Sequence, residues 1–173
     1  MPTKNLQQNT SPIKLSILVC LRNKGSNVKV MLKVLHAMIE VSHEILFIHD
    51  NPDDACVELV NILKSRDPNT RLIRNQLGLG FVDALKSGVE ASRGEYILIF
   101  AGDEAGPVLA IEDMINLMDQ NCDLVSCTRY AHGGRRLGGS RIGHILSWSA
   151  NKLFFYFFGS ALTDCTTGIK MFR

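Results

Sequence analysis

Carboxylate side chains follow two short apolar segments of the chain, and they are the residues best suited to bind a ligand. Asp50 follows the run Ile45–Ile48, and Asp103 and Glu104 follow the run Tyr96–Phe100. A carboxylate in such a place can accept a hydrogen bond from a nucleotide base or hold a divalent metal against a diphosphate. Each could instead cap the helix that follows, because acidic residues are favoured there. We interpret Asp50 as a ligand-binding residue, whereas spacing alone leaves both interpretations open for Asp103.

The last third of the chain is basic. Residues 124–173 carry seven basic side chains and one acidic side chain, whereas residues 1–123 carry 12 basic and 16 acidic ones. Arg129, Arg135, Arg136 and Arg141 alternate with glycines in this part, and guanidinium groups bind phosphates through paired hydrogen bonds. This part therefore favours a phosphate, a nucleotide or a lipid headgroup as partner, with a solvated basic face as the alternative. The net charge of +2 gives no argument for nucleic acid.

Five consecutive aromatic residues, Phe154 to Phe158, end a helical pattern that begins at Ile142. Successive residues of a helix point in all directions, so these rings cannot all enter one core. Some of them must meet a partner, a membrane interface or another part of the protein.

One glycine-containing motif resembles a dinucleotide-binding site but is incomplete. The sequence Gly78-Leu79-Gly80 resembles the start of a dinucleotide-binding loop, but Asp83 occupies the place of the third glycine. A turn before a helix is therefore favoured over a dehydrogenase.

The five cysteines form no C-x-x-C pair and indicate reduced thiols, with no zinc site. With no signal peptide and no apolar stretch of about 18 residues, a cytoplasmic protein with at most peripheral membrane contact is expected.

The chain of 173 residues suits one domain, with residues 1–13 as a flexible tail and residues 14–173 as the domain. Apolar runs predict strands at Leu15–Cys20, Ile45–Ile48, Arg71–Arg74, Tyr96–Phe100 and Leu124–Cys127. Helical spacing predicts helices at Val28–Glu40, Ala55–Ser65, Leu79–Ser92, Leu109–Asn121 and Ile142–Phe158. This alternation is typical of an α/β protein whose parallel sheet is covered on both faces. Ligands bind such sheets at the carboxyl ends of the strands.

Several segments in the same order resemble the family 2 glycosyltransferases, most closely the dolichol-phosphate mannose synthase-like branch. The segments are KLSILVCLRNKGSNV, HEILFIHDNPDD, NQLGLGFVDALKSGVEASRGEYILIFAGDEAGP, TRYAHGG, SWSAN and TDCTTGIKMFR. The resemblance implies a GT-A fold, a three-layer sandwich with a mostly parallel central sheet. It also implies a nucleotide-sugar donor, Mg²⁺ or Mn²⁺, inversion at the anomeric carbon, and a polyprenyl phosphate as acceptor.

The resemblance assigns roles to individual residues. The residues that it implies for nucleotide-sugar binding are Cys20, Arg22, Lys24, Ile48, Asp50, Ala101, Gly102, Asp103 and Arg129. Asp103 would also be the metal ligand, and Arg129 would reach the donor phosphates. Arg141 and Ser147 would lie on the acceptor side. Asp164 would take a proton if the acceptor were a hydroxyl group.

The chain departs from the family pattern at several of these positions. Ala101 replaces the first aspartate of the D-x-D motif and Ala105 replaces another ligand, so Asp103 alone is left and weak metal binding is expected. Family members also continue beyond the point where this chain ends, so a C-terminal segment is expected to be lacking. Two hypotheses follow: an active transferase, or a degenerate, non-catalytic binding or partner subunit. A nucleotidyltransferase with a similar sheet is a further alternative for the function. As for partners, a homo-oligomer is an open alternative to a monomer.

Overall fold

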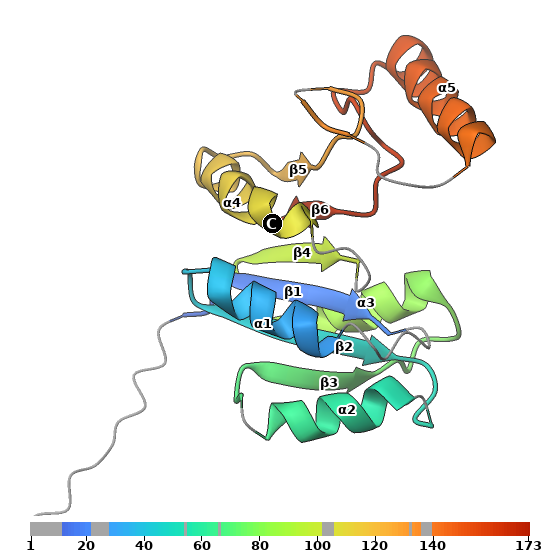
Figure 1. Ribbon diagram of the computed structural model, residues 1–173. Coiled ribbons are helices and arrows are strands. Elements are labelled where there is room, and N and C mark those ends of the chain that lie inside the picture. The colour runs from blue at the N-terminus through green and yellow to red at the C-terminus, as the bar shows by residue number, and fades with distance from the viewer. Residues whose placement is uncertain are drawn as a thin grey trace, which may run out of the picture.

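A six-stranded sheet forms the centre of the protein, in the order β3-β2-β1-β4-β6-β5 (Figure 1). The computed structural model describes residues 12–21, 28–53, 55–65, 67–101, 106–131, 133–135 and 140–173. The strands are β1 (Leu15–Cys20), β2 (His43–His49), β3 (Thr70–Arg74), β4 (Tyr96–Phe100), β5 (Leu124–Ser126) and β6 (Lys170–Phe172). The predicted strands are confirmed to within two residues at each end, whereas β6 lies outside every predicted strand.

The strands bring one set of ends to a common edge. β1 runs parallel to β2 and β4, with Cys20 opposite Ile48 and Val19 opposite Phe100. β6 runs antiparallel to both β4 and β5, so β5 points the same way as β1 to β4. The carboxyl ends of β1 to β5 therefore lie at the edge where β6 begins.

The helices cover both faces of the sheet, which makes the three-layer α/β sandwich that was expected. The covering helices are α1 (Val28–Met38), α2 (Ala55–Lys64), α3 (Phe81–Ala91) and α4 (Ile111–Asp119), with a 3₁₀ helix η1 (Gly106–Ala110). A further helix, α5 (Arg141–Phe158), does not cover the sheet (Figure 1). Residues of β1 alternate between the two faces: Ile17 and Val19 pack with the core residues of α1, α2 and α4, and Leu18 packs with Ala84 of α3. Figure 1 shows α1, α2 and α4 on the near face and α3 behind the sheet.

A glycine lets α3 lie close to the sheet. A Cβ atom at Gly88 would come within 3.0 Å of Ile48 Cδ1 and 3.2 Å of Leu18 Cδ1. Such distances are shorter than most Cβ contacts, so a larger residue here would require the Ile48 and Leu18 side chains, or α3 itself, to shift.

The predicted helix Leu109–Asn121 is divided. Its first part is the tight turn η1, which contains Pro107, and the α-helical part begins at Ile111. Proline cannot donate a backbone hydrogen bond, so it is tolerated only in the first turn of a helix. The helix ends at Asp119, and Asn121 then adopts the left-handed conformation with φ of 67°.

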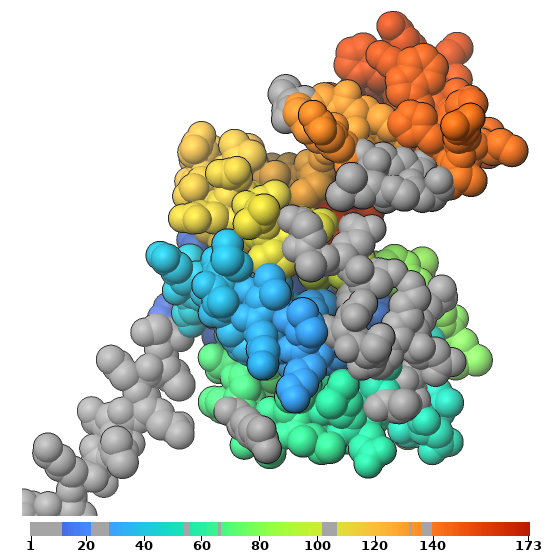
Figure 2. Space-filling model, in the orientation of Figure 1, coloured from blue at the N-terminus to red at the C-terminus, as the bar shows by residue number. Residues whose placement is uncertain are grey.

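Helix α5 stands apart from the sheet and its covering helices (Figures 1 and 2). It begins at Ser140, whose side chain accepts a hydrogen bond from Gly143 N at 3.0 Å. It ends at Gly159, which has a φ of 59°. The side chains of Phe154 to Phe158 are all exposed, whereas the sequence predicted only that some of them lie outside the core. None of the helices in the described part of the chain combines the length and apolar character needed to cross a membrane.

Candidate functional site

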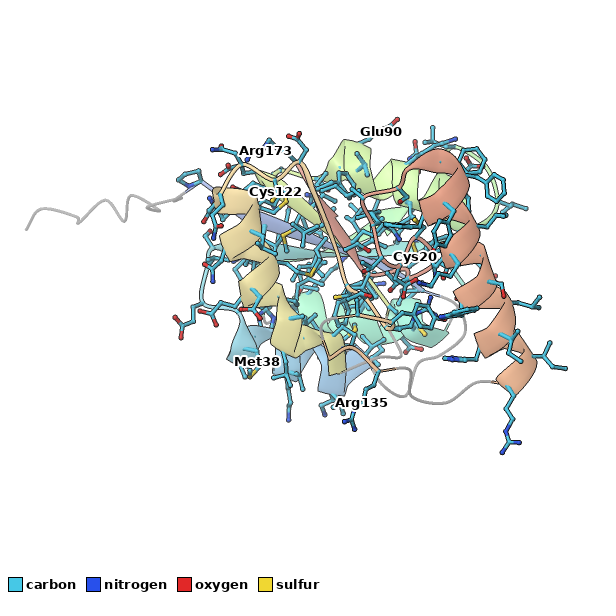
Figure 3. All side chains as sticks on the ribbon, turned by 90° about the horizontal axis from the view of Figure 1, so that it is seen from above. Cys20, Met38, Glu90, Cys122, Arg135 and Arg173 are labelled. Atoms are coloured by element: carbon cyan, nitrogen blue, oxygen red, sulfur yellow. The ribbon has the colours of Figure 1, made fainter. Side chains whose placement is uncertain are left out.

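The carboxyl edge of the sheet carries four of the residues predicted to bind a nucleotide-sugar: Cys20, Ile48, Asp50 and Ala101. Cys20 ends β1 opposite Ile48, and Ala101 follows Phe100, the partner of Val19. Seen from above in Figure 3, Cys20 lies on the side of the sheet that faces α5, whereas Cys122 and Arg173 lie on the opposite side. Ile48 is fully buried and belongs to the core beneath α3. Its side chain is therefore part of the core and not of the edge surface, whereas Cys20 and Ala101 are half-buried at the edge.

Asp50 lies at the same edge and is held by a polar network. Its Oδ1 accepts a hydrogen bond from Asn75 Nδ2 at 2.6 Å, and its Oδ2 accepts one from Gly80 N at 3.2 Å. The buried Asn75 in turn accepts a hydrogen bond from Ser87 Oγ at 2.9 Å. The network joins the end of β2 to the loop that leads into α3. A carboxylate has about four acceptor positions, so these two bonds are compatible with recognition of a base by Asp50.

Asn75 was not among the predicted site residues. Its signal in the sequence is its place directly after β3, at the same edge as Asp50. That place is only a weak signal in the sequence, because the role of Asn75 depends on the folded chain, in which its side chain bridges Asp50 and Ser87.

A second cluster forms beyond β5, where Arg129 meets Asp164. Arg129 Nε donates to Asp164 Oδ2 at 2.7 Å, and Arg129 Nη2 donates to Asp164 Oδ1 at 2.9 Å. The backbone N–H of Arg129 donates to the same carboxylate at 3.1 Å. Arg129 Nη2 also lies 3.2 Å from Ser147 Oγ and 2.6 Å from Thr166 Oγ1. Three of the predicted residues are therefore in direct contact: Arg129, Ser147 and Asp164.

The Asp164 carboxylate is an ionised structural anchor. Its side chain has no exposed area. Burial alone would raise the pKa of Asp164, but the hydrogen bonds from Arg129 and Thr166 outweigh burial and hold the pKa well below its ordinary value. Oδ1 also accepts hydrogen bonds from Asn151 Nδ2 at 3.1 Å and from the backbone N–H of Thr166 at 3.1 Å. A carboxylate with these partners accepts hydrogen bonds readily and accepts a proton poorly.

A pocket of about 200 Å³ opens beside this cluster, between α5 and the loops that face it. It is lined by Tyr130, Ala131, Trp148, Asn151, Lys152, Phe155 and Thr163. Lys152 Nζ lies 5.8 Å from the centre of the Trp148 ring. Arg141, predicted for the acceptor side, is exposed at the first turn of α5 and has no role in the Arg129 cluster among the contacts of the described residues.

The remaining predicted site residues, Arg22, Lys24, Gly102 and Asp103, lie outside the described residues, as does Ala105. Their assignments stay predictions. At the end of β4, the side chain of Ala101 is a methyl group, which cannot bind a metal. Within the described ranges, no group of three His, Cys, Asp or Glu side chains is arranged to hold a metal ion. The described residues alone therefore do not make a metal site.

Comparison with known proteins gives matches over nearly the whole chain. The sequence profile of glycosyl transferase family 2 matches residues 16–173. A dolichyl-phosphate beta-glucosyltransferase of Dictyostelium discoideum is 28% identical, over 96% of this chain and 54% of its own length. A dodecaprenyl-phosphate galacturonate synthase of Rhizobium johnstonii is 26% identical, over 99% of this chain and 51% of its own length. The chain thus spans about half the length of these two relatives.

Solved structures share the fold. Glucosyl-3-phosphoglycerate synthase from Mycobacterium tuberculosis, solved with Mn²⁺, uridine diphosphate and glucosyl-3-phosphoglycerate, has a TM-score of 0.68 and 12% identity. The similarity covers 93% of this chain and 57% of that one. The same enzyme has also been solved with Mg²⁺ and uridine diphosphate. The GT-A type of sandwich that the sequence predicts is therefore confirmed.

Proposed function

Because the chain belongs to glycosyl transferase family 2, we propose that it transfers a sugar from a nucleotide-diphospho-sugar to a polyprenyl phosphate, with inversion at the anomeric carbon. The two relatives named above support this acceptor, since both are named for a polyprenyl phosphate and both align with almost the whole chain.

The state of Asp164 is the observation that carries the choice of acceptor. A hydroxyl acceptor must lose a proton as it attacks, so it requires a base. Asp164 is the carboxylate that the sequence suggested for that task, but its pKa is held low and its oxygens accept hydrogen bonds from Arg129, Asn151 and Thr166. A phosphate acceptor is already ionised near neutral pH and requires no base. The anchored state of Asp164 therefore favours a phosphate.

The proposed reaction is a single displacement. An oxygen of the acceptor phosphate forms a bond to the anomeric carbon, and the bond from that carbon to the diphosphate breaks on the opposite face. The electron pair of the broken bond leaves with the nucleoside diphosphate, and no proton is transferred. Arg129, which the resemblance assigns to the donor phosphates, lies with its Nη2 3.2 Å from Oγ of Ser147, a residue assigned to the acceptor side. We therefore propose that both stabilise phosphate oxygens where donor and acceptor meet.

On the donor side, we propose that Cys20, Asp50 and the backbone around Ile48 bind the nucleoside. Asp50 would accept a hydrogen bond from the base, and the network of Asn75 would hold its carboxylate in place. The predicted roles of Arg22 and Lys24 complete this pocket.

A divalent metal is part of the proposal at the level of the family. Glucosyl-3-phosphoglycerate synthase was solved in complex with uridine diphosphate and Mn²⁺ or Mg²⁺, and such an ion would stabilise the charge of a leaving diphosphate. The described residues do not themselves fit a metal, since Ala101 offers no ligand and Asp103 lies outside them. The roles proposed above for Arg129, Ser147 and Asp50 do not depend on a metal ion.

We also propose that α5 meets an anionic membrane surface, where a polyprenyl phosphate would be found. Tyr156, Phe157 and Phe158 are 73%, 77% and 73% exposed, so a large apolar surface faces solvent. Arg141 and Lys152 of the same helix are exposed, and no carboxylate occurs between Asp123 and Asp164 in the sequence. Near an anionic leaflet each basic residue contributes about 1 kcal/mol, and inserted aromatic rings add apolar burial.

A transfer assay tests the proposed function. The protein is incubated with undecaprenyl phosphate and radiolabelled UDP- or GDP-sugars, with and without Mg²⁺ or Mn²⁺, and label in the lipid fraction is counted. Undecaprenol without the phosphate is the matched control. We expect transfer to the phosphate and none to the alcohol. Comparable transfer to the alcohol, or to a water-soluble hydroxyl acceptor, would show that the acceptor class is wrong.

The alternative of a non-catalytic subunit is favoured by one observation, the methyl group of Ala101 at the end of β4. It predicts that a nucleotide-sugar raises the melting temperature of the protein, because a ligand of the folded state stabilises it. It also predicts that no acceptor is glycosylated in the transfer assay.

A further inference from the structure

Helix α5 is attached to the rest of the protein in an unusual way. Among its 18 residues, all of which are described, Asn151 is the one buried residue, at 5% exposure. Large apolar side chains of the same helix are exposed instead: Ile142, Ile145, Leu146, Trp148, Leu153, Phe154, Phe155, Tyr156, Phe157 and Phe158. Amphipathic helices are ordinarily fixed by burial of an apolar face. Besides the ring contact of His144 with Tyr130, at 5.6 Å between centroids, polar contacts hold α5 in place.

The side-chain amide of Asn151 makes these contacts through both its nitrogen and its oxygen. Nδ2 lies 3.1 Å from Asp164 Oδ1 and 3.1 Å from Thr166 Oγ1, and Oδ1 accepts a hydrogen bond from Cys165 N at 2.7 Å. Asn151 thus binds three successive residues of the turn that precedes β6. Nδ2 also donates to the backbone carbonyl of Ser147, one turn earlier in α5, at 2.9 Å.

We propose that Asn151 is a positioning residue, a polar latch that fastens α5 to the turn Asp164–Thr166 and so holds Ser147 against Arg129. The contacts form a closed set. Ser147 Oγ lies 2.7 Å from Thr166 Oγ1 and 3.2 Å from Arg129 Nη2, and Arg129 is fixed by Asp164. When the latch is released, Ser147 moves with α5 while Arg129 stays with Asp164. The consequence for catalysis rests on the proposed function, whereas the latch itself does not.

The chemistry of the site requires an amide. Asp164 is an ionised acceptor and Cys165 N is a donor, so the residue between them must donate on one end and accept on the other. Aspartate has the same shape as asparagine but has no N–H group, and it would place a second carboxylate beside Asp164. Two carboxylates at this distance share a proton when the pH falls, which restores one hydrogen bond.

Trp148, the one tryptophan of the chain, gives a direct readout of the latch. It lies on α5 three residues before Asn151 and lines the same pocket, at 48% exposure. Its fluorescence anisotropy and its quenching by acrylamide therefore report on α5 with no background from other tryptophans.

The experiment compares Asn151→Asp and Asn151→Ala with the wild type and with Ser149→Asp. Ser149 is exposed on α5, so Ser149→Asp adds the same charge without touching Asp164. At pH 7.5 we expect lower anisotropy and stronger quenching of Trp148 in both Asn151 variants, and wild-type values in the control. As the pH is lowered to about 5, we expect Asn151→Asp alone to return toward wild-type values, because its carboxylate pair takes up a proton.

Unchanged anisotropy and quenching in both Asn151 variants would overturn the latch, as would equal pH dependence of Asn151→Ala and Asn151→Asp. If an Asn151 variant fails to fold, Thr166→Val serves in its place. Thr166 is exposed, and its hydroxyl group contacts Asn151, Ser147 and Arg129. The same lower anisotropy and stronger quenching of Trp148 are expected in Thr166→Val. Wild-type values of both in Thr166→Val would overturn the latch.

The catalytic consequence is measured separately, with undecaprenyl phosphate as the probe. A lost hydrogen bond to a charged group corresponds to about a 10- to 100-fold change in an equilibrium constant. We therefore expect Asn151→Asp to raise KM for undecaprenyl phosphate about 10-fold or more, with little change in KM for the donor. A wild-type protein without transferase activity would contradict the proposed function, and the fluorescence of Trp148 would still decide the latch.

Discussion

Replacement of Asp164 by asparagine tests whether this carboxylate is an anchor or a base. Asp164→Asn keeps the shape of the side chain but removes its charge, and it turns an N–H group toward donors of Arg129. Loss of one partner of a buried ion pair costs about 3–5 kcal/mol. Because the Arg129 side chain is 26% exposed, water compensates part of this loss. We therefore expect the free energy of unfolding to fall by about 3 kcal/mol, near the lower end of that range.

The pH dependence of this difference distinguishes the two roles. The folded-state pKa of Asp164 lies below the ordinary value, so its contribution to stability is fully present above the unfolded-state pKa. That contribution is lost only as the pH falls through the lower, folded-state value. The difference in unfolding free energy between wild type and Asp164→Asn should therefore be constant from pH 8 to pH 5. It should decrease only below about pH 4, the unfolded-state range of an aspartate.

Urea denaturation followed by circular dichroism at pH 5, 6, 7 and 8 measures this difference. Ser126→Ala is a matched control, since Ser126 Oγ lies 3.4 Å from the backbone carbonyl of Asp164 and does not touch the carboxylate. A difference that changes by more than about 1 kcal/mol between pH 5 and pH 8 would mean that Asp164 titrates there, as a general base does. A loss of less than about 1 kcal/mol at pH 7, typical of an exposed pair, would refute the anchor.

Three further predictions concern other parts of the protein. Asp50→Asn should weaken nucleotide binding by about 1–3 kcal/mol in calorimetry, and an unchanged affinity in a folded variant would exclude base recognition by Asp50. Gly88→Ala should lower the urea midpoint, because a methyl group 3.0 Å from Ile48 Cδ1 costs about 1–3 kcal/mol and outweighs a gain of up to about 1 kcal/mol in helix propensity. A midpoint equal to or above that of the wild type would contradict the close packing of α3. Phe157→Ser should reduce co-sedimentation with anionic vesicles, which should also fade as salt rises, without changing nucleotide affinity. Sedimentation independent of lipid charge, together with a stable dimer in the ultracentrifuge, would assign the aromatic residues of α5 to a protein interface.

The local pattern of the sequence was sufficient for most of the sheet and its helices. Tyr96–Phe100 and, except for Ser16, Leu15–Cys20 are short apolar runs, as expected of strands covered on both faces, and their predicted ends agree with the structure. β6 could not be found in this way. Lys170–Phe172 has only three residues, and it is a strand because β4 and β5 lie on either side of it.

Part of the candidate site could likewise be predicted from the sequence, and part could not. Asp50, Cys20 and Ala101 could be assigned to one edge because they follow predicted parallel strands, and parallel strands bring their carboxyl ends together. Asn75 could not be assigned, since its importance comes from a bridge between Asp50 and Ser87 that exists only in the folded chain.

By itself, the sequence determined the α/β class, the basic last third and the aromatic end of α5, because residue type and local spacing decide these properties. The tertiary structure alone decided that Arg129, Ser147 and Asp164, which lie up to 35 residues apart in the sequence, form one cluster around Asn151. It also decided that Asp164 is an anchor and not an exposed carboxylate. The pKa and the role of a carboxylate depend on burial and on its hydrogen-bond donors, and distant segments of the chain supply both.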